Sequence, residues 1–454
     1  MPIQSTNPST GKVERVFDEW SVDHTISIVS AVNDAFKDWK NTSFSQRSDC
    51  LKSMAEVLRS SADKFAQLMA AEMGKPLSSG KAEVLKSATV CDYYAEHGAS
   101  MLTSESKIVD GMQTYVEYTP MGTVLAVMPW NYPIWQVLRI AIPTLMSGNT
   151  MVLKHASNVP QCALAIEEAF KASLFPENVF RTLLIGAGQV ETVLDQDSVI
   201  GVCLTGSEAA GRKVAAAAGA RLKKSVMELG GSDAFVVLAD ADLDKAALTG
   251  ATSRCSNAGQ ACIAAKRFIV HKDVYESFIS KLKEQMECII PGDPLDDNTV
   301  MGPMASHQFR TDLQSQVDRS LAAGGKLILG GSIPDGEGAY YPPTIIIDMP
   351  FDASVSREEF FGPVAMVFCA NDEEEAMQMA NDSAFGLGGS VWTRDGGKGL
   401  KLARQIEAGL VYLNGRVSSR PPLPFGGIKN SGYGRELSTY GIREFCNIKS
   451  VCIG

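Results

Sequence analysis

The sequence predicts an α/β protein in which two successive units each contain a largely parallel sheet covered by helices. From about residue 113, short apolar strands alternate with helical segments, which is the pattern of a parallel sheet. The alternation begins again after the turn at 228–231. At 454 residues the chain is also longer than one ordinary core requires. We therefore expect two α/β units rather than one very wide sheet.

The first hundred residues are predicted to be helical, because apolar side chains such as Ile28, Val32 and Phe36 recur at three- and four-residue steps. Another helix should open at Pro160. The C-terminal stretch 444–453 is predicted to be a β-segment with no helix after it, suited to pairing with another subunit. The remaining expected strands lie at 116–120, 123–128, 150–154, 181–186, 199–204, 234–238, 267–270, 326–329, 364–368 and 409–413.

Composition excludes several classes of function. A formal net charge of -10 and a pI near 5.2, without a basic block, argue against a nucleic-acid or acidic-membrane partner. No apolar run is long enough to span a bilayer, and the N-terminus lacks the pattern of a signal peptide, so a cytoplasmic protein is expected. The ten cysteines are scattered without metal-ligand spacing. We expect them to be mostly reduced and buried, and we expect no metal site.

One cysteine has surroundings that suit a nucleophile. The segment Asn257–Cys262 surrounds a thiol with small residues, which leave room for a substrate and let backbone N–H groups approach it. The N–H of Cys262 and a nearby side-chain amide would stabilise the oxyanion that forms when a thiolate attacks a carbonyl. Taken alone, a cysteine in such a loop is more often structural.

Three other turns contain candidate partners for that thiol. Glu228 precedes a Gly-Gly turn and is a candidate general base, although a structural carboxylate is the commoner reading of one such residue. Asn131 lies between two prolines after a strand and is a candidate second oxyanion donor. Gly206 and Ser207 lie at a strand-to-helix junction that could bind a pyrophosphate, a weak signal by itself.

Together, the motifs PWNYP, LTGSEAAG, ELGG, NAGQAC, EEFFGP and PFGGIKNSGYGRE resemble the aldehyde dehydrogenase superfamily along essentially the whole chain. The stretches EMGKP, CDYYAEHG and MPWNYPIWQVLR are most similar to the succinate-semialdehyde dehydrogenases within it. The resemblance implies an aldehyde dehydrogenase fold. It assigns 1–101 and 121–229 to a Rossmann-like cofactor domain, 230–430 to an α/β catalytic domain, and 102–120 and 435–454 to a β arm that builds a homodimer or homotetramer.

The resemblance also assigns roles. Cys262 is the implied nucleophile, Glu228 the base and Asn131 the oxyanion donor. The thiohemiacetal would give hydride to a nicotinamide, and water activated by Glu228 would hydrolyse the remaining thioester. The implied cofactor contacts are Lys154 near the adenine ribose, Ser207 and Trp130 near the pyrophosphate, beside Gly206, and Glu359 at the nicotinamide ribose.

Ser157 bears on the choice of cofactor. NAD-preferring relatives commonly have a glutamate at this place, and its carboxylate would repel a 2′-phosphate. Ser157 is neutral, and Lys154 is close enough in sequence to pair with the phosphate. We therefore predict a preference for NADP, with NAD as a possible second cofactor. The alternative is that Ser157 only caps a helix.

Arg139 is the predicted contact for a substrate carboxylate, because it matches an arginine that succinate-semialdehyde dehydrogenases use and follows Asn131 on an apolar helix. A structural ion pair is the alternative. Trp135 is predicted to line the pocket. Some relatives have a second arginine where this chain has Ser256, so Ser419, with Arg416 or Arg420, is expected to supply the missing contacts. Ala264 replaces the second cysteine of redox-switched relatives, which argues against a local disulfide.

The sequence thus predicts oxidation of succinate semialdehyde to succinate. Glutarate semialdehyde or an aliphatic aldehyde remains an alternative substrate. An acceptor other than water is disfavoured by Glu228. A cysteine hydrolase or an inactive homologue is the alternative from another class, but no histidine lies in a recognisable motif and no implied catalytic residue is missing.

Overall fold

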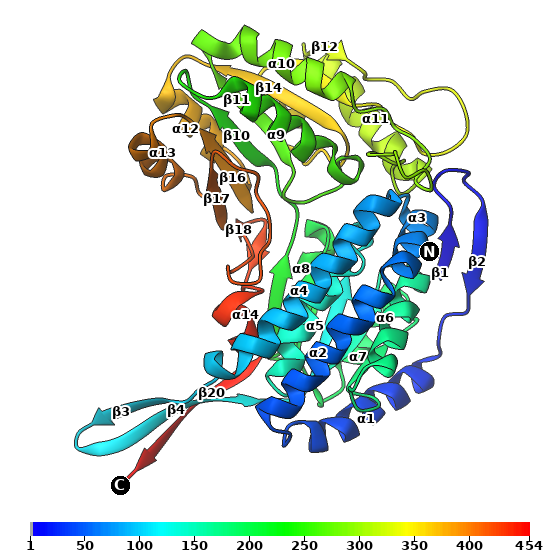
Figure 1. Ribbon diagram of the computed structural model, residues 1–454, viewed down its shortest axis with the longest axis vertical. Coiled ribbons are helices and arrows are strands. Elements are labelled where there is room, and N and C mark those ends of the chain that lie inside the picture. Colours follow the sequence, from blue (N-terminus) through cyan, green and yellow to red (C-terminus); the bar gives the residue numbers. More distant parts are fainter. Residues whose placement is uncertain (1–2) are drawn as a thin grey trace.

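Two lobes and a projecting arm make up the molecule, and the computed structural model describes residues 3–454 of the chain (Figure 1). The first lobe holds a six-stranded sheet, the second a seven-stranded sheet, and the arm a three-stranded sheet. Neighbouring strands in the two large sheets are mostly parallel, and helices lie against them. The α/β fold class predicted from the sequence is confirmed.

The sheet of the first lobe has the strand order β19-β9-β8-β5-β6-β7. Its β6 strand is buried throughout and β5 nearly so, as expected for parallel strands covered on both faces. Only β19, at the edge, runs antiparallel. The strands are β5 (Thr123–Met128), β6 (Thr150–His155), β7 (Phe180–Thr182), β8 (Val199–Thr205), β9 (Lys224–Glu228) and β19 (Gly432–Tyr433).

Helices of this lobe begin and end where the sequence supplies caps. Ser43 and Gln46 form a capping box at the start of α2, and Gly74 takes the left-handed conformation that ends α3. Every residue of α5 is buried. The helices are α1 (Val22–Trp39), α2 (Phe44–Ser60), α3 (Ala62–Met73), α4 (Leu77–Met101), α5 (Trp135–Met146), α6 (Pro160–Ala172), α7 (Val190–Leu194) and α8 (Glu208–Ala220), with the short 3-10 helix η1 (Ala187–Gln189).

The sheet of the second lobe has the order β12-β13-β14-β11-β10-β16-β17. A cluster of aromatic rings from Phe235, Phe268 and Trp392 fills part of its core. Its strands are β10 (Asp233–Val237), β11 (Ala265–His271), β12 (Lys326–Leu329), β13 (Thr344–Ile347), β14 (Val364–Ala370), β16 (Gly388–Trp392) and β17 (Leu410–Leu413). Its helices are α9 (Leu243–Cys255), α10 (Tyr275–Glu287), α11 (His307–Ala322), α12 (Glu373–Asn381) and α13 (Gly396–Ala403), with η2 (Ser256–Gly259), η3 (Lys272–Val274) and η4 (Ser354–Arg357).

The arm projects away from both lobes and ends at the C-terminus (Figure 1). The predicted C-terminal β-segment is β20, and it pairs antiparallel with β4 of the same chain. Apolar side chains such as Ile108 and Ile448 are exposed on this sheet. The arm contains β3 (Glu105–Val109), β4 (Met112–Pro120) and β20 (Cys446–Ile453), and the short helix α14 (Ser438–Arg443) comes before β20. Outside the arm there are two small two-stranded sheets. One pairs β1 (Ile3–Thr6) with β2 (Val13–Phe17), and the other pairs β15 (Phe385–Gly386) with β18 (Ile428–Lys429).

The structure differs from the sequence prediction in some strands. The strand expected at 181–186 ends at Thr182, and the chain then leaves the sheet towards Gly186, whose N–H donates to Glu19. Strands β1 and β2 were not expected, because the first hundred residues were predicted to be helical. Strands β3, β9, β13 and β16 and the two-residue strands β15, β18 and β19 were not expected either. The domain limits inferred from the resemblance stay a prediction, and they did not include β19 in the first sheet. Within residues 3–454, no helix combines the length and apolarity that crossing a membrane requires.

Candidate active site

The carboxyl edge of the first sheet brings three predicted site segments together. Because β5, β8 and β9 are parallel neighbours, their last residues share one edge, and Thr205 of β8 lies in register with Glu228 of β9. The Asn131 loop follows β5 at this edge, and Gly206 and Ser207 follow β8. The N–H of Gly206 donates to the carbonyl of Glu228 at 3.0 Å. Ligands of open α/β sheets bind at such an edge.

Cys262 reaches the same place from the second sheet. Residues 229–232 cross from the end of β9 to the start of β10, and β10 is the parallel neighbour of β11. Asp233 pairs with Ala265 in that ladder, so Cys262, three residues before Ala265, lies beside the crossing segment. The Sγ atom of Cys262 lies 4.0 Å from Oε2 of Glu228. The nucleophile and base predicted from the sequence are therefore neighbours.

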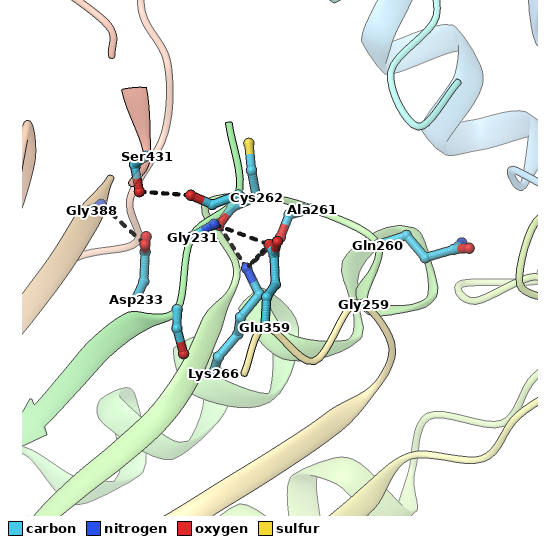
Figure 2. Close-up of polar contacts among 12 residues, drawn as sticks. Gly231, Asp233, Gly259, Gln260, Ala261, Cys262, Lys266, Glu359, Gly388 and Ser431 are labelled. Atoms are coloured by element: carbon cyan, nitrogen blue, oxygen red, sulfur yellow. Dashed lines mark hydrogen bonds and ion pairs between the residues drawn. The ribbon is translucent and has the colours of Figure 1, made fainter. Parts of the chain in front are cut away.

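The loop that carries Cys262 has an unusual backbone and a buried anchor. Asn257 and Ala258 have positive φ values of 54° and 51°, and Gly259 continues the turn at 73°. A Cβ at Gly259 would clash with the backbone of Gly362, so only glycine fits there. Lys266 anchors the far side of the loop, since its Nζ donates to the carbonyls of Ala261 at 3.0 Å and Cys262 at 2.7 Å (Figure 2).

Lys266 also pairs with Glu359, at 3.0 Å. The same Glu359 oxygen accepts the N–H of Gly231 at 3.1 Å, so one carboxylate joins the crossing segment to the nucleophile loop (Figure 2). The Cys262 thiol points away from this cluster in the figure. Lys266 was not singled out in the sequence, because nothing in the motif shows that its amine folds back onto the loop before it.

Asn131 is fixed by a network of buried partners. Its side-chain amide donates to the carbonyl of Gln260 at 3.0 Å, while its own carbonyl accepts from Lys75 at 2.8 Å and Asn257 at 2.9 Å. Glu83 pairs with Lys75 and accepts the N–H groups at the start of α5. An amide has two hydrogens, and the second remains for a ligand. The oxyanion role of Asn131 stays a prediction, with this geometry in its favour.

Burial sets the ionisation of the two reactive groups. Burial raises the pKa of Glu228 to about 7; Arg139 opposes the shift and Glu436 adds to it. Burial likewise raises the pKa of the Cys262 thiol well above its ordinary value, and the Glu228 carboxylate raises it further, whereas Lys266 and Arg139 lower it. The resting site therefore favours a thiol, with a neighbouring carboxyl whose pKa suits proton transfer near neutral pH.

Cys262 lines two chambers that meet at its side chain. The first chamber has a volume of about 560 Å³, and six of the predicted residues line it besides Cys262. Two of them are the predicted catalytic residues Asn131 and Glu228, and four are predicted cofactor contacts: Trp130, Gly206, Ser207 and Glu359. The ring of Trp130 stacks on Phe309 at a centroid distance of 4.9 Å. Ser207 caps α8, whose N-terminus faces the same region. This chamber is shaped for a large, partly apolar ligand with an anionic group.

Lys154 and Ser157 do not line either large chamber. Lys154 is the fifth residue of β6, and Ser157 follows that strand in a separate small recess. Burial lowers the pKa of Lys154, and the nearby Glu19 carboxylate opposes the shift. Glu19 was missed by the sequence reasoning because it precedes α1, far from the motif. The contacts of Lys154 and Ser157 with a cofactor stay predictions.

The second chamber, of about 550 Å³, is positively charged. Of the predicted substrate contacts, Trp135, Arg139 and Ser419 line it. Arg416 and Arg420 line it as well, and so does Lys86 of α4, which the sequence reasoning missed because a lysine on a long helix is usually solvated. Ser256 and Ala264 are also in the lining.

Arg139 has a different environment from the one expected. Its side chain is 2% exposed, pairs with Glu436 through Nε, and lies 3.4 Å from Glu228 through Nη2. These carboxylates raise the pKa of the guanidinium against the lowering effect of burial. The charge of Arg139 is thus already balanced within the protein. This geometry favours the alternative of a structural ion pair, and the carboxylate-binding role stays a prediction.

The sequence of the chain matches a protein family and individual proteins of named activity. The model for the aldehyde dehydrogenase family matches residues 1–451. A succinate-semialdehyde dehydrogenase (NADP+) 1 from Mycobacterium ulcerans is 48% identical over 458 residues and both chains are covered completely. The protein of the same description from Mycobacterium tuberculosis is 46% identical, again over the whole of both chains.

A solved structure gives the same result for the fold. The succinic semialdehyde dehydrogenase from Streptococcus pyogenes, crystallised in complex with NADP+ as the cofactor, has a TM-score of 0.97, 37% sequence identity and 99% coverage of each chain. The family and fold inferred from the motifs are therefore confirmed.

Proposed function

The chain belongs to the aldehyde dehydrogenase family, and we propose that it oxidises succinate semialdehyde to succinate with NADP. One observation supports the substrate above the others: Cys262 opens onto a chamber lined by three cationic residues besides the carboxylate-paired Lys75 and Arg139, namely Lys86, Arg416 and Arg420. A carboxylated aldehyde matches that charge, and a neutral one does not.

The reaction begins at the Cys262 thiol. Glu228, with Oε2 at 4.0 Å from Sγ, accepts the thiol proton, and the thiolate adds to the aldehyde carbon to form a thiohemiacetal. The spare hydrogen of the Asn131 amide and the N–H of Cys262 stabilise the negative oxygen. Lys266 supports this step because it fixes the two carbonyls on either side of the Cys262 N–H.

The first chamber fits a dinucleotide in volume and in its lining. Gly206 and Ser207 would hold the pyrophosphate at the N-terminus of α8, and Glu359 a ribose hydroxyl. NADP held there would supply a hydride acceptor, and loss of hydride from the thiohemiacetal carbon would leave a thioester on Cys262. The neutral Ser157 and the cationic Lys154 suit a 2′-phosphate, which supports NADP over NAD.

Glu228 then completes the cycle. Once Glu228 has released the thiol proton to solvent, its carboxylate removes a proton from water, which attacks the thioester carbon, and the Cys262 thiolate leaves as the acid forms. Among the described residues lining the two chambers there is no histidine, so a cysteine–histidine hydrolase has no support here.

The test is oxidation of an aldehyde panel by the purified protein with each cofactor, measured from the absorbance of reduced nicotinamide. We expect succinate semialdehyde with NADP to give the highest kcat/KM, above glutarate semialdehyde and aliphatic aldehydes. Cys262→Ala should abolish turnover while NADP binding persists, and Cys288→Ala, which changes an exposed thiol, should retain turnover. Equal efficiency with an aliphatic aldehyde would refute the substrate assignment.

We also propose that the protein is a cytoplasmic homodimer or homotetramer. Ile108, Val109, Ile448 and Ile453 are all exposed on the one small sheet of the arm, and this supports assembly, because grouped exposed apolar residues are a feature of interfaces. Its ten free cysteines are consistent with a reducing compartment.

A further inference from the structure

Lys86 is placed where its charge faces the second chamber. It projects from α4, is partly buried, and lines the chamber that Cys262 also lines. Its Nζ lies 4.1 Å from the centroid of the Trp135 ring and donates to Oγ of Ser419 at 2.9 Å. The ring beneath and the hydroxyl beside it fix the position of the ammonium group.

The hydroxyl group of Ser419 accepts two hydrogen bonds, and its own hydrogen remains available as a donor. Its oxygen accepts from Lys86 at 2.9 Å and from Nε1 of Trp135 at 3.0 Å. A hydroxyl has two lone pairs and one hydrogen, and neither of these neighbours accepts a hydrogen bond. Among the described residues Ser419 has no acceptor for its own hydrogen, which is therefore available to a ligand in the chamber.

The other charged groups of the chamber are balanced or exposed. Arg139 is paired with Glu436, and Lys75 with Glu83. Arg416 and Arg420 are exposed. Within residues 3–454, no carboxylate lies within 4.0 Å of the Lys86 ammonium. Consistent with this, burial lowers the pKa of Lys86 to about 8, with Arg139, Arg416 and Arg420 acting in the same direction and Glu83 opposing them.

We propose that Lys86 and Ser419, held against Trp135, bind the carboxylate of the substrate and make Lys86 a specificity-determining residue. This inference rests on the proposed function, since it requires a carboxylated aldehyde. Lys86 supplies a charge that no protein group neutralises, and Ser419 supplies a directed hydrogen. The two donors together can hold the two oxygens of one carboxylate.

The test compares succinate semialdehyde with butanal, which has the same number of carbons and a methyl group in place of the carboxylate. In Lys86→Met we expect kcat/KM for succinate semialdehyde to fall roughly ten- to a hundredfold, the effect of losing a charge-assisted hydrogen bond, mostly through KM. The ratio of succinate semialdehyde to butanal efficiency should fall with it. Ser419→Ala should lower the same ratio by a smaller factor.

Lys81→Met is the matched control, because Lys81 lies on the same helix but outside the chamber. Equal losses for both substrates in Lys86→Met would identify Lys86 as structural and overturn the inference, as would an unchanged ratio. If the wild-type protein did not favour succinate semialdehyde over butanal, the proposed function would fail instead. Titration with succinate then decides about Lys86 separately: weaker binding to Lys86→Met supports the inference, and equal binding overturns it.

Discussion

Replacing Lys266 by methionine should loosen the loop that carries the nucleophile. The lysine side chain is 0% exposed and its ammonium donates to the carbonyls of Ala261 and Cys262 and to Glu359 (Figure 2). Methionine has a similar length and fills the same space, but it has neither the charge nor the donors. The substitution therefore removes polar contacts without creating a large cavity.

The size of the destabilisation depends on the groups that lose their partner when Lys266 is replaced, namely the Glu359 carboxylate and two loop carbonyls. Removing one member of a buried ion pair destabilises by about 3–5 kcal/mol. The Glu359 side chain is 20% exposed and keeps the N–H of Gly231, which places the effect at the lower end, about 3 kcal/mol. The two carbonyls that lose their donor act in the same direction. A change of this size in the free energy of local opening corresponds to an increase of roughly a hundredfold in the open population.

Hydrogen–deuterium exchange of the native protein measures this opening directly. In Lys266→Met, amides of residues 257–266 should exchange roughly a hundredfold faster than in the wild type. The core strands β5 and β6 should be unaffected, and kcat should fall because Cys262 is less well placed. Lys401→Met, at an exposed position on α13, is the control. Exchange of 257–266 within threefold of wild type would refute the reasoning.

Two further predictions concern the base and the cofactor. Because burial holds the pKa of Glu228 at about 7 and only the carboxylate activates water, kcat should fall about tenfold per pH unit as the pH drops below that value. Glu228→Gln should slow both the formation of reduced cofactor in the first turnover and the turnovers that follow, because Glu228 accepts the thiol proton and later activates water; a first turnover at the wild-type rate would contradict the first of these two roles. Ser157→Glu should shift the ratio of kcat/KM values from NADP towards NAD, because a carboxylate repels the 2′-phosphate; an unchanged ratio, or a wild-type preference for NAD, would show that Ser157 does not select the cofactor.

Local sequence patterns were sufficient to predict the buried parallel strands and some helix ends. Apolar segments such as 123–128 and 150–154 became buried parallel strands, and Gly74 ended the helix before it. Strand β9 was missed because Lys224 and Ser225 open it with polar residues. Strand β16 was missed because it begins with two glycines, and glycine has little intrinsic preference for a strand. Both strands form because of their neighbours in the sheet.

The site shows a sharper limit. Cys262, Glu228 and Asn131 were identifiable because each lies in a compact motif. The hydrogen-bonding partners of the charged residues are separated by much longer stretches of chain, and no local pattern relates them. Arg139 pairs with Glu436, 297 residues away, and Lys86 donates to Ser419, 333 residues away. The sequence showed that Arg139 was unusual on an apolar helix. Only the fold shows that the Arg139 guanidinium is already paired with Glu436, and that Lys86 is the partly buried cation of the chamber that has no carboxylate partner within residues 3–454.

The short distance between Glu228 and Cys262 depends on the segment that joins the two lobes, since each residue belongs to a different sheet. Ser431 lies in the C-terminal segment that returns to the first sheet, and it forms hydrogen bonds with the crossing segment and with the second lobe. Its carbonyl accepts the N–H of Leu229, its hydroxyl donates to the carbonyl of Gly230 at 2.6 Å, and the same oxygen accepts the N–H of Gly386 at 3.0 Å. A Cβ at Gly231 would meet the carbonyl of Cys262 at 2.8 Å, so the crossing packs directly on the nucleophile loop. Gly231, the second glycine after Glu228, is therefore required by close approach of two backbones, and this approach explains why base and nucleophile can be held 4.0 Å apart across a boundary between lobes.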